Sequence, residues 1–187
     1  MQTIKLSSLA QAVAICVGAS LFCGNALAAM KGDKGTYDQA KTSAKATYDT
    51  DKKACDAMSG NAKDICVAEA KAKRVKTDEN AEAAYKNTPK AREHAIHEGA
   101  EADYKVAKER CDDKAGNDKD VCIKEAKAMM TRTVADARAT KKGTEARMDA
   151  NKDKRDADYK VAAEKCDAMS GDPKAACVAD AKARFGK

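Results

Sequence analysis

The stretch YDTDKKACDAMSGNAKDIC, residues 48–66, decides the fold of this chain because its pattern occurs three times. In each copy a tyrosine is followed, after six residues, by a cysteine and, after ten more, by a second cysteine. The copies are Tyr48, Cys55 and Cys66; Tyr104, Cys111 and Cys122; and Tyr159, Cys166 and Cys177. Internal repetition at a fixed spacing predicts an array of similar structural units.

A helix-breaking pair of residues lies midway between the two cysteines of each copy. These pairs are Gly60-Asn61, Gly116-Asn117 and Gly171-Asp172. A glycine can end one helix in the left-handed conformation, and an asparagine or aspartate can cap the next helix. Pro173, after the third pair, suits a first helical position. Each copy is therefore predicted to form two antiparallel helices joined by a tight turn.

The two cysteines of a copy lie about one helical turn on either side of this bend, so their side chains meet if both face inward. Many pairings are open to six cysteines. The repeated spacing favours the local ones: 55 with 66, 111 with 122, and 166 with 177. Each would stabilise the fold by about 3 kcal/mol. A redox-active pair is the alternative, but such pairs lie at helix N-termini, so we expect structural disulfides.

Residues 1–28 have the pattern of a secretory signal peptide. Lys5 precedes an apolar run, and Ala26-Leu27-Ala28 matches the small residues of a cleavage site. Cleavage near Ala28 would remove Cys16 and Cys23 and leave an even number of cysteines, as expected in an oxidising compartment. No later stretch is apolar enough to span a membrane. We predict a periplasmic or secreted protein.

The composition after the signal is that of long helices with a thin core. Leucine is absent after residue 28, and Ala, Lys, Arg and Glu make up about half of residues 29–187. Because few large apolar side chains remain, the fold must depend on helix formation, close approach of small residues and cross-links. An enclosed catalytic pocket is not expected.

Two further breaks are expected to separate the repeats. Residues 87–89 (Asn-Thr-Pro) are predicted to end one helix and start another, and residues 141–144 (Lys-Lys-Gly-Thr) to do the same. The sequence thus predicts an all-α fold with a flexible leader over 29–36 and helical hairpins over 37–87, 88–143 and 144–187, the last one truncated. No bridge joins one hairpin to the next, so we expect an extended array.

His94 and His97 are the only histidines, and Glu93 and Glu98 lie beside them. A spacing of three places both imidazoles on one helical face, where copper or zinc could bind. A third strong ligand is not evident, and a pair of histidines on an exposed helix is more often solvated. We therefore predict no metal site and no cofactor, with His94 and His97 as the candidates if a metal binds.

The repeated Tyr48, Tyr104 and Tyr159 lie seven residues before the first cysteine, on the cysteine face. They are expected to cover the disulfide seam; the alternative is a row of aromatic contacts for a partner. The chain has a net charge of +6 with both signs interspersed, which is typical of solvated helix faces. Nucleic-acid binding is not expected, because no basic block with interleaved aromatic residues is present.

The alanine- and lysine-rich stretches over residues 68–76 and 124–139 resemble the central rod of the periplasmic TolA proteins. The resemblance covers most of the chain after the signal and is one of composition. It implies long helices in the cell envelope. The anchor and globular C-terminal domain of TolA proteins have no recognised counterpart here, so their energy-transducing role is not expected. The predicted disulfide-linked hairpins are also similar to those of the mitochondrial twin Cys-x9-Cys proteins. The basic, helical composition of the chain is similar to that of small periplasmic chaperones.

These observations favour an exported, non-enzymatic helical repeat protein that serves as a spacer or interaction scaffold of the cell envelope. Its partner would be a protein or another envelope component. No Ser-His-Asp set, phosphate loop or apolar acid pair points to catalysis. The alternatives are a chaperone-like binding protein of the periplasm and a copper- or zinc-binding protein.

Overall fold

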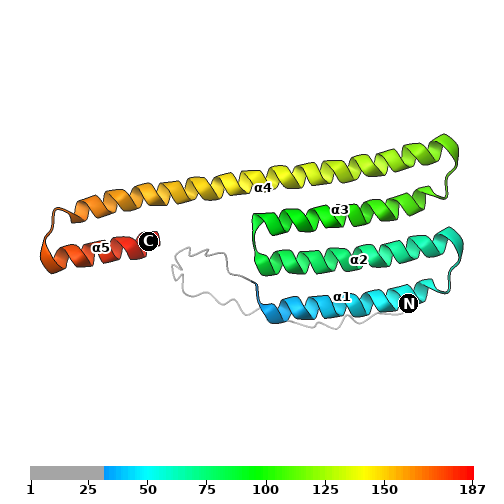
Figure 1. Cartoon of the computed structure of the whole chain (residues 1–187), viewed down its shortest axis with the longest axis horizontal. Coiled ribbons are helices and arrows are strands. Elements are labelled where there is room, and N and C mark those ends of the chain that lie inside the picture. Colours follow the sequence, from blue (N-terminus) through cyan, green and yellow to red (C-terminus); the bar gives the residue numbers. More distant parts are fainter. Residues whose placement is uncertain (1–31) are drawn as a thin grey trace, which may run out of the picture.

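The computed structural model describes residues 32–187, which fold into five α-helices (Figure 1). They are α1 (Lys34–Cys55), α2 (Gly60–Lys86), α3 (Pro89–Cys111), α4 (Gly116–Cys166) and α5 (Gly171–Phe185). This part of the chain contains no strand. The predicted all-α fold of disulfide-stapled hairpins is confirmed. The expected signal peptide, 1–28, lies outside the described residues.

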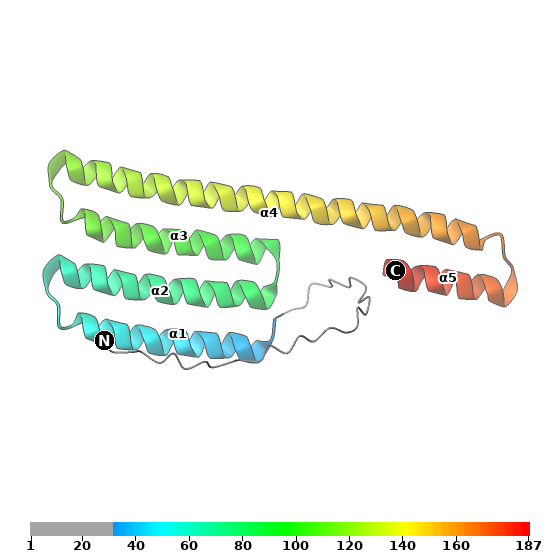
Figure 2. The same cartoon turned by 180° about the vertical axis from the view of Figure 1, so that it is seen from behind.

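The helices lie side by side in a single layer, each antiparallel to the next (Figures 1 and 2). α1 packs on α2, α2 on α3, α3 on the first half of α4, and α5 on the far end of α4. Within residues 32–187 no helix packs on any helix other than its neighbours in the chain. None of the described helices therefore covers either face of the layer.

The interior consists of narrow seams between adjacent helices. Apart from three cysteines and two valines, the buried apolar side chains are all alanines: Ala44, Ala70, Ala72, Ala83, Ala95, Ala100, Ala102, Ala137 and Ala181. Small side chains at a contact allow helix axes to approach closely. The largest side chains that are almost wholly buried are Cys55, Cys111 and Cys166. The disulfides are thus part of the core, which is as thin as the composition predicts.

α1 begins at Lys34, three residues earlier than expected. The side chain of Asp33 caps the helix, because its carboxylate accepts a hydrogen bond of 2.7 Å from the backbone N–H of Thr36. This bond is the main cause of the lowered pKa of Asp33. Residues 34–36 of the predicted flexible leader are therefore helical, and residues 29–31 lie outside the described part.

The predicted break between the first two hairpins is confirmed. Asn87 adopts the left-handed conformation, with φ of 47°, and ends α2. The hydroxyl of Thr88 accepts a hydrogen bond of 3.1 Å from the N–H of Ala91, and Pro89 occupies the first position of α3. Proline is favourable there because a first helical residue has no N–H partner to lose. This turn lays the second hairpin alongside the first.

The predicted break at residues 141–144 is wrong, because α4 continues through it for a total of 51 residues. Gly143 costs about 1 kcal/mol within a helix, but no proline follows it, and the surrounding residues favour helix. Thr144 was expected to cap a new helix; its hydroxyl instead donates to the carbonyl of Thr140, 2.9 Å away and one turn back. The second and third hairpins consequently share one helix.

The continuous α4 carries the third hairpin away from α1, α2 and α3 (Figure 1). At 1.5 Å per residue, α4 is about 76 Å long. Its residues 146–155 are all exposed. The molecule is therefore a four-helix layer with a long projecting arm.

Replacement of Val106 by alanine is expected to lower the free energy of unfolding by about 2 kcal/mol, since it leaves a void in a packed seam. Val106 is 8% exposed and packs with Ala72 and Ala102. Chemical denaturation followed by circular dichroism measures the change. Thr50→Ala is the matched control, because Thr50 is the α1 counterpart of Val106 and is exposed; it should shift stability by less than about 0.5 kcal/mol. Equal effects of the two substitutions would contradict the burial.

Candidate functional site

The three stapled bends are the repeated feature of the structure. Disulfides join Cys55 to Cys66, Cys111 to Cys122, and Cys166 to Cys177, each with a Cα–Cα distance of 5.7 Å. The predicted pairing is confirmed. In each bend the N–H three residues after the first cysteine donates to the carbonyl of that cysteine at 3.0 Å. The bends therefore share one geometry.

The glycines of the bends are left-handed as predicted, but each begins the second helix of its hairpin and does not end the first, which stops at its cysteine. The predicted caps also differ. Gly60, Gly116 and Gly171 have φ of 57°, 56° and 65°, which is the left-handed conformation that glycine adopts without strain. The N-cap positions, however, fall one residue before each glycine, and none of these residues makes a side-chain cap bond. The predicted capping roles of residues 61, 117 and 172 are wrong. Pro173 is the third residue of α5, not its first.

Asn61 connects the first hairpin to the second. Its amide donates to the backbone carbonyl of Glu109, at 3.0 Å, and to Oδ1 of Asp113, at 2.6 Å. Both acceptors lie at the end of α3 or just beyond it. A side chain expected to cap its own helix thus stabilises the contact between α2 and α3.

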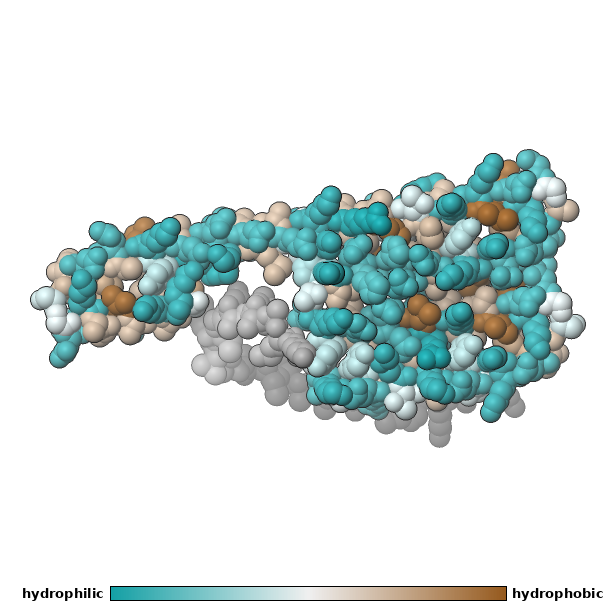
Figure 3. Space-filling view, viewed as in Figure 1, coloured by the Kyte–Doolittle hydropathy of each residue, from teal (hydrophilic) through white to brown (hydrophobic). Residues whose placement is uncertain are grey.

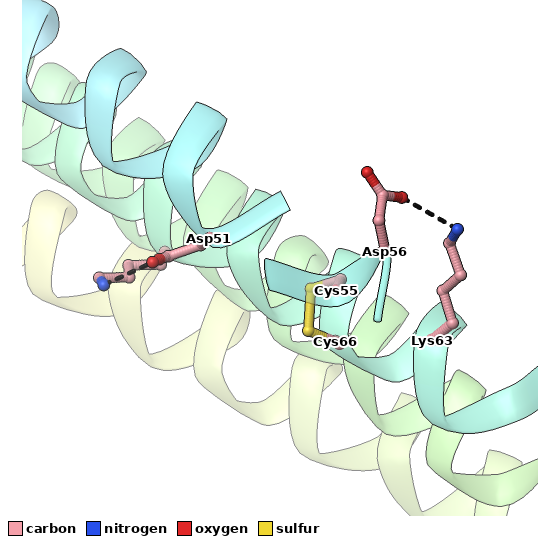
Figure 4. The surroundings of a disulfide bond; sticks show 6 residues. Asp51, Cys55, Asp56, Lys63 and Cys66 are labelled. Carbon is pink, nitrogen blue, oxygen red and sulfur yellow. Dashed lines mark hydrogen bonds and ion pairs between the residues drawn. A yellow bond between two sulfur atoms is a disulfide. The ribbon is translucent and has the colours of Figure 1, made fainter. Parts of the chain in front are cut away.

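An ion pair spans each bend outside the disulfide. Figure 4 shows the first, Asp56 with Lys63, whose charged atoms are 2.9 Å apart. The pair recurs as Asp112 with Lys119 at 3.0 Å and as Asp167 with Lys174 at 2.9 Å. This pair was not predicted, although an aspartate follows each first cysteine and a lysine precedes each second cysteine by three residues. The hydrogen bond from Lys63 lowers the pKa of Asp56.

Each repeated tyrosine lies against the return helix of its own hairpin. The guanidinium of Arg74 in α2 lies 5.4 Å from the ring centre of Tyr48. Tyr104 borders a surface groove together with Met130 of α4. Tyr159 meets Phe185 of α5 edge to face, with ring centres 6.5 Å apart. All three tyrosines are partly exposed. Their placement agrees with a role in covering the seam.

The two histidines lie on α3 beside acidic side chains. Oε1 of Glu98 is 3.9 Å from Nδ1 of His94 and 3.3 Å from Nδ1 of His97. Glu79 of α2 approaches His94 to 3.7 Å. Among residues 32–187, no group of three or more His, Cys, Asp or Glu side chains has an arrangement that could hold a metal ion.

An open groove of about 400 Å³ runs along α2 and α3 on one face of the layer. Its apolar floor consists of Val67, Ala68, Ala72, Val75 and Ala102. Charged side chains of both signs line its rim: Lys63, Asp64, Lys71, Glu98, Lys105 and Glu109. Figure 3 shows hydrophobic patches set in a largely hydrophilic surface over this part of the molecule. The sequence signal for the groove is the eight-residue spacing of the two valines, which places them on the same side of α2 about two turns apart.

The third hairpin is held by fewer contacts than the others. α5 has 15 residues and packs only on α4 among the described helices. Besides the disulfide and the ring contact, Lys187 reaches back to Asp156 of α4. Asp156 also accepts a hydrogen bond of 2.8 Å from Lys152, and these two lysines lower the pKa of Asp156 to about 2.

The chain matches no protein-family model, no curated protein and no solved structure. Within residues 32–187, no helix is both long and apolar enough to cross a membrane. The function must therefore be argued from the geometry of the helices.

Replacement of Cys166 and Cys177 by serine is expected to release α5 while the other four helices stay folded. The bridge contributes about 3 kcal/mol, and an isolated helix of this length is marginal in water. Hydrogen exchange followed by mass spectrometry should show lost protection over residues 171–185. The matched control is the Cys111 and Cys122 double serine variant, in which α3 keeps its protection because it also packs on α2. Unchanged protection of α5 would contradict this prediction.

Proposed function

We propose that this protein is an exported, non-enzymatic spacer or interaction scaffold of the cell envelope. The observation that carries the proposal is the layer of helices with open faces and a 51-residue helix that extends beyond it. Such a shape offers a large surface and a defined length. It encloses little volume between its elements, in contrast to the usual pocket of an enzyme.

The stapled bends support a mechanical role. A disulfide, an ion pair and a short turn fix each pair of antiparallel helices at one end, so the helices resist sliding along each other. Alanine seams alone bury little apolar surface per residue. The bridges supply rigidity that a leucine-free helical layer lacks.

The envelope location rests on three arguments. Disulfides persist in oxidising compartments, such as the periplasm and the cell exterior. The pattern of residues 1–28 is that of a signal peptide. The helical composition resembles that of the rod of TolA proteins, which lies in the periplasm. The partner of such a scaffold would be a protein or another envelope component that binds an open face of the layer.

The scaffold proposal predicts partners that depend on the stapled structure. The full chain, immobilised in its oxidised form, should retain specific envelope components from a cell-envelope extract. The same chain, reduced and alkylated, should lose them, because its hairpins are no longer fixed. Quantitative mass spectrometry of the two eluates measures the difference. Equal recovery from both forms would contradict a role for the stapled fold.

A chaperone-like binding protein is a second candidate, favoured by the groove along α2 and α3. Its apolar floor and charged rim suit an extended or helical apolar segment of a client. The groove is open along its length, so clients of different sequence can enter it. The charged rim would keep the complex hydrated.

Substitution of Val75 by lysine tests this candidate. The oxidised protein should suppress the aggregation of a reduced, unfolded client protein, measured by light scattering, and V75K should lose most of this effect because a charge stands in the groove floor. V178K is the control: Val178 is the α5 counterpart of Val67, where no third helix forms a groove. Suppression that survives V75K would contradict binding in this groove.

A further inference from the structure

We propose that two copies of this chain pair through their α4 helices, antiparallel and related by a two-fold axis near Gly143. The surface involved is the edge of α4 that faces away from α3 and α5. The partner is a second copy of the same chain. This inference does not depend on the proposed function.

The α2–α3 seam inside the molecule provides the template. Its buried side chains are Ala72 and Ala83 from α2, and Ala95, Ala102 and Val106 from α3. Ala72, Ala102 and Val106 form one packed cluster. Ala83 lies three turns from Ala72 and Ala95 two turns from Ala102, so both lie along the same seam.

α4 contains the repeat counterparts of both helices of this seam. The first half of α4 is the repeat counterpart of α2, because it follows Cys122 in the same way that α2 follows Cys66; the offset is 56 positions. The last part of α4 is the repeat counterpart of α3, because it leads to Cys166 in the same way that α3 leads to Cys111; the offset is 55 positions. The five buried residues of the seam therefore correspond to Ala128, Ala139, Ala150, Ala157 and Val161. The residue type is the same at all five positions.

In the structure these five residues form a stripe in which Ala128 is partly exposed and the other four are exposed. They recur at steps of 11, 11, 7 and 4 residues, all close to whole numbers of helical turns, so they share one face of α4. The buried residues Val134, Ala137 and Cys166 lie on another face, toward α3 and α5. Val161 is 57% exposed, whereas its counterpart Val106 is 8% exposed. The first half of α4 thus carries the α2 side of the template seam, and its last part carries the α3 side.

The charges beside the stripe give an independent argument. Across the α2–α3 seam, Arg110 pairs with Glu69 at 2.6 Å and Lys76 pairs with Asp103 at 2.7 Å. The counterparts on α4 are Lys165 with Glu125, and Arg132 with Asp158, and both pairs keep opposite signs. Within residues 32–187 none of these four α4 side chains makes an ion pair.

The residue pairs that meet across the α2–α3 seam determine where the two-fold axis crosses α4. Ala72 packs against residues 102 and 106, so Ala128 of one copy would face residues 157 and 161 of the other. The midpoint of this register falls between residues 143 and 144. Gly143 stands there, and a Cβ added to it would meet nothing within 4 Å, so a second helix has room to approach. Three positions depart from the template. Lys154 replaces Gly99 and must direct its side chain out of the seam, and Lys124 and Thr131 replace Ala68 and Val75, which pack at the border of the template cluster.

Because α4 is continuous, its stripe can be covered by a second copy of the chain but not by the same chain. In the first two hairpins, the turn at 87–89 folds α3 back onto α2. The counterpart residues are Gly143, Thr144 and Glu145, which lack the proline and remain helical. The third hairpin therefore cannot reach the second hairpin of its own chain. Exchange of equivalent elements between copies is the arrangement known as domain swapping.

The test is the mass of the oxidised full chain in solution, by light scattering after size exclusion and by sedimentation equilibrium. We expect a dimer that dissociates on dilution. A157R should raise the dissociation constant of the dimer by about 100-fold, because each of the two copies then places an unpaired charge in the interface. The matched control is A46R, which should leave the mass unchanged, since Ala46 is the exposed α1 counterpart of Ala157. Circular dichroism should show both variants folded.

A second variant installs the missing turn. G143N combined with E145P gives α4 the Asn-Thr-Pro sequence of residues 87–89, so the third hairpin can fold back onto its own chain. We expect a compact monomer, with a shorter maximum dimension in small-angle X-ray scattering. A wild-type protein that stays monomeric at all concentrations would overturn the proposal. So would a dimer that survives A157R but is lost in A176R, because that result would place the contact on α5.

Discussion

The contact between alanine faces of adjacent helices is the interaction on which the structure depends. Alanine favours helix and lets axes approach closely, but each buried methyl group adds little hydrophobic free energy. A layer built from such seams has no central core to hold it. The disulfides compensate at the bends, where Cys55, Cys111 and Cys166 are the best buried side chains of the described chain. Seams set the spacing of the helices, and bridges fix their register.

The sequence was sufficient for the features that depend on local spacing. The positions of glycine between paired cysteines predicted the hairpins, the left-handed glycines and all three bridges. Contacts between hairpins were not predictable in this way, since nothing near Asn61 indicates that its amide reaches Glu109. The Asp56–Lys63 pair could have been predicted, because its two residue types recur at the same positions in every repeat. The tyrosines could be placed on the seam but not assigned their individual contacts.

The error at residues 141–144 shows how weak a helix-stop signal is without proline. Gly143 and Thr144 resemble the end and start of two helices, and Thr144 is even the counterpart of Thr88. The residues on either side of this threonine differ: Gly143 replaces Asn87, and Glu145 replaces Pro89. Pro89 excludes continuation of the helix, whereas Glu145 favours it. These two positions therefore separate a third hairpin that packs on the layer from one that projects beyond it.

The projecting part of α4 makes the molecule a lever. About 22 residues of α4 extend past the start of α3, which corresponds to about 33 Å of helix that has no contact with α1, α2 or α3 and packs only on α5 at its far end. A tilt of about 10° at the α3–α4 seam would displace the third bend by about 6 Å. A small change in packing at one end of the molecule is thereby converted into a large movement at the other.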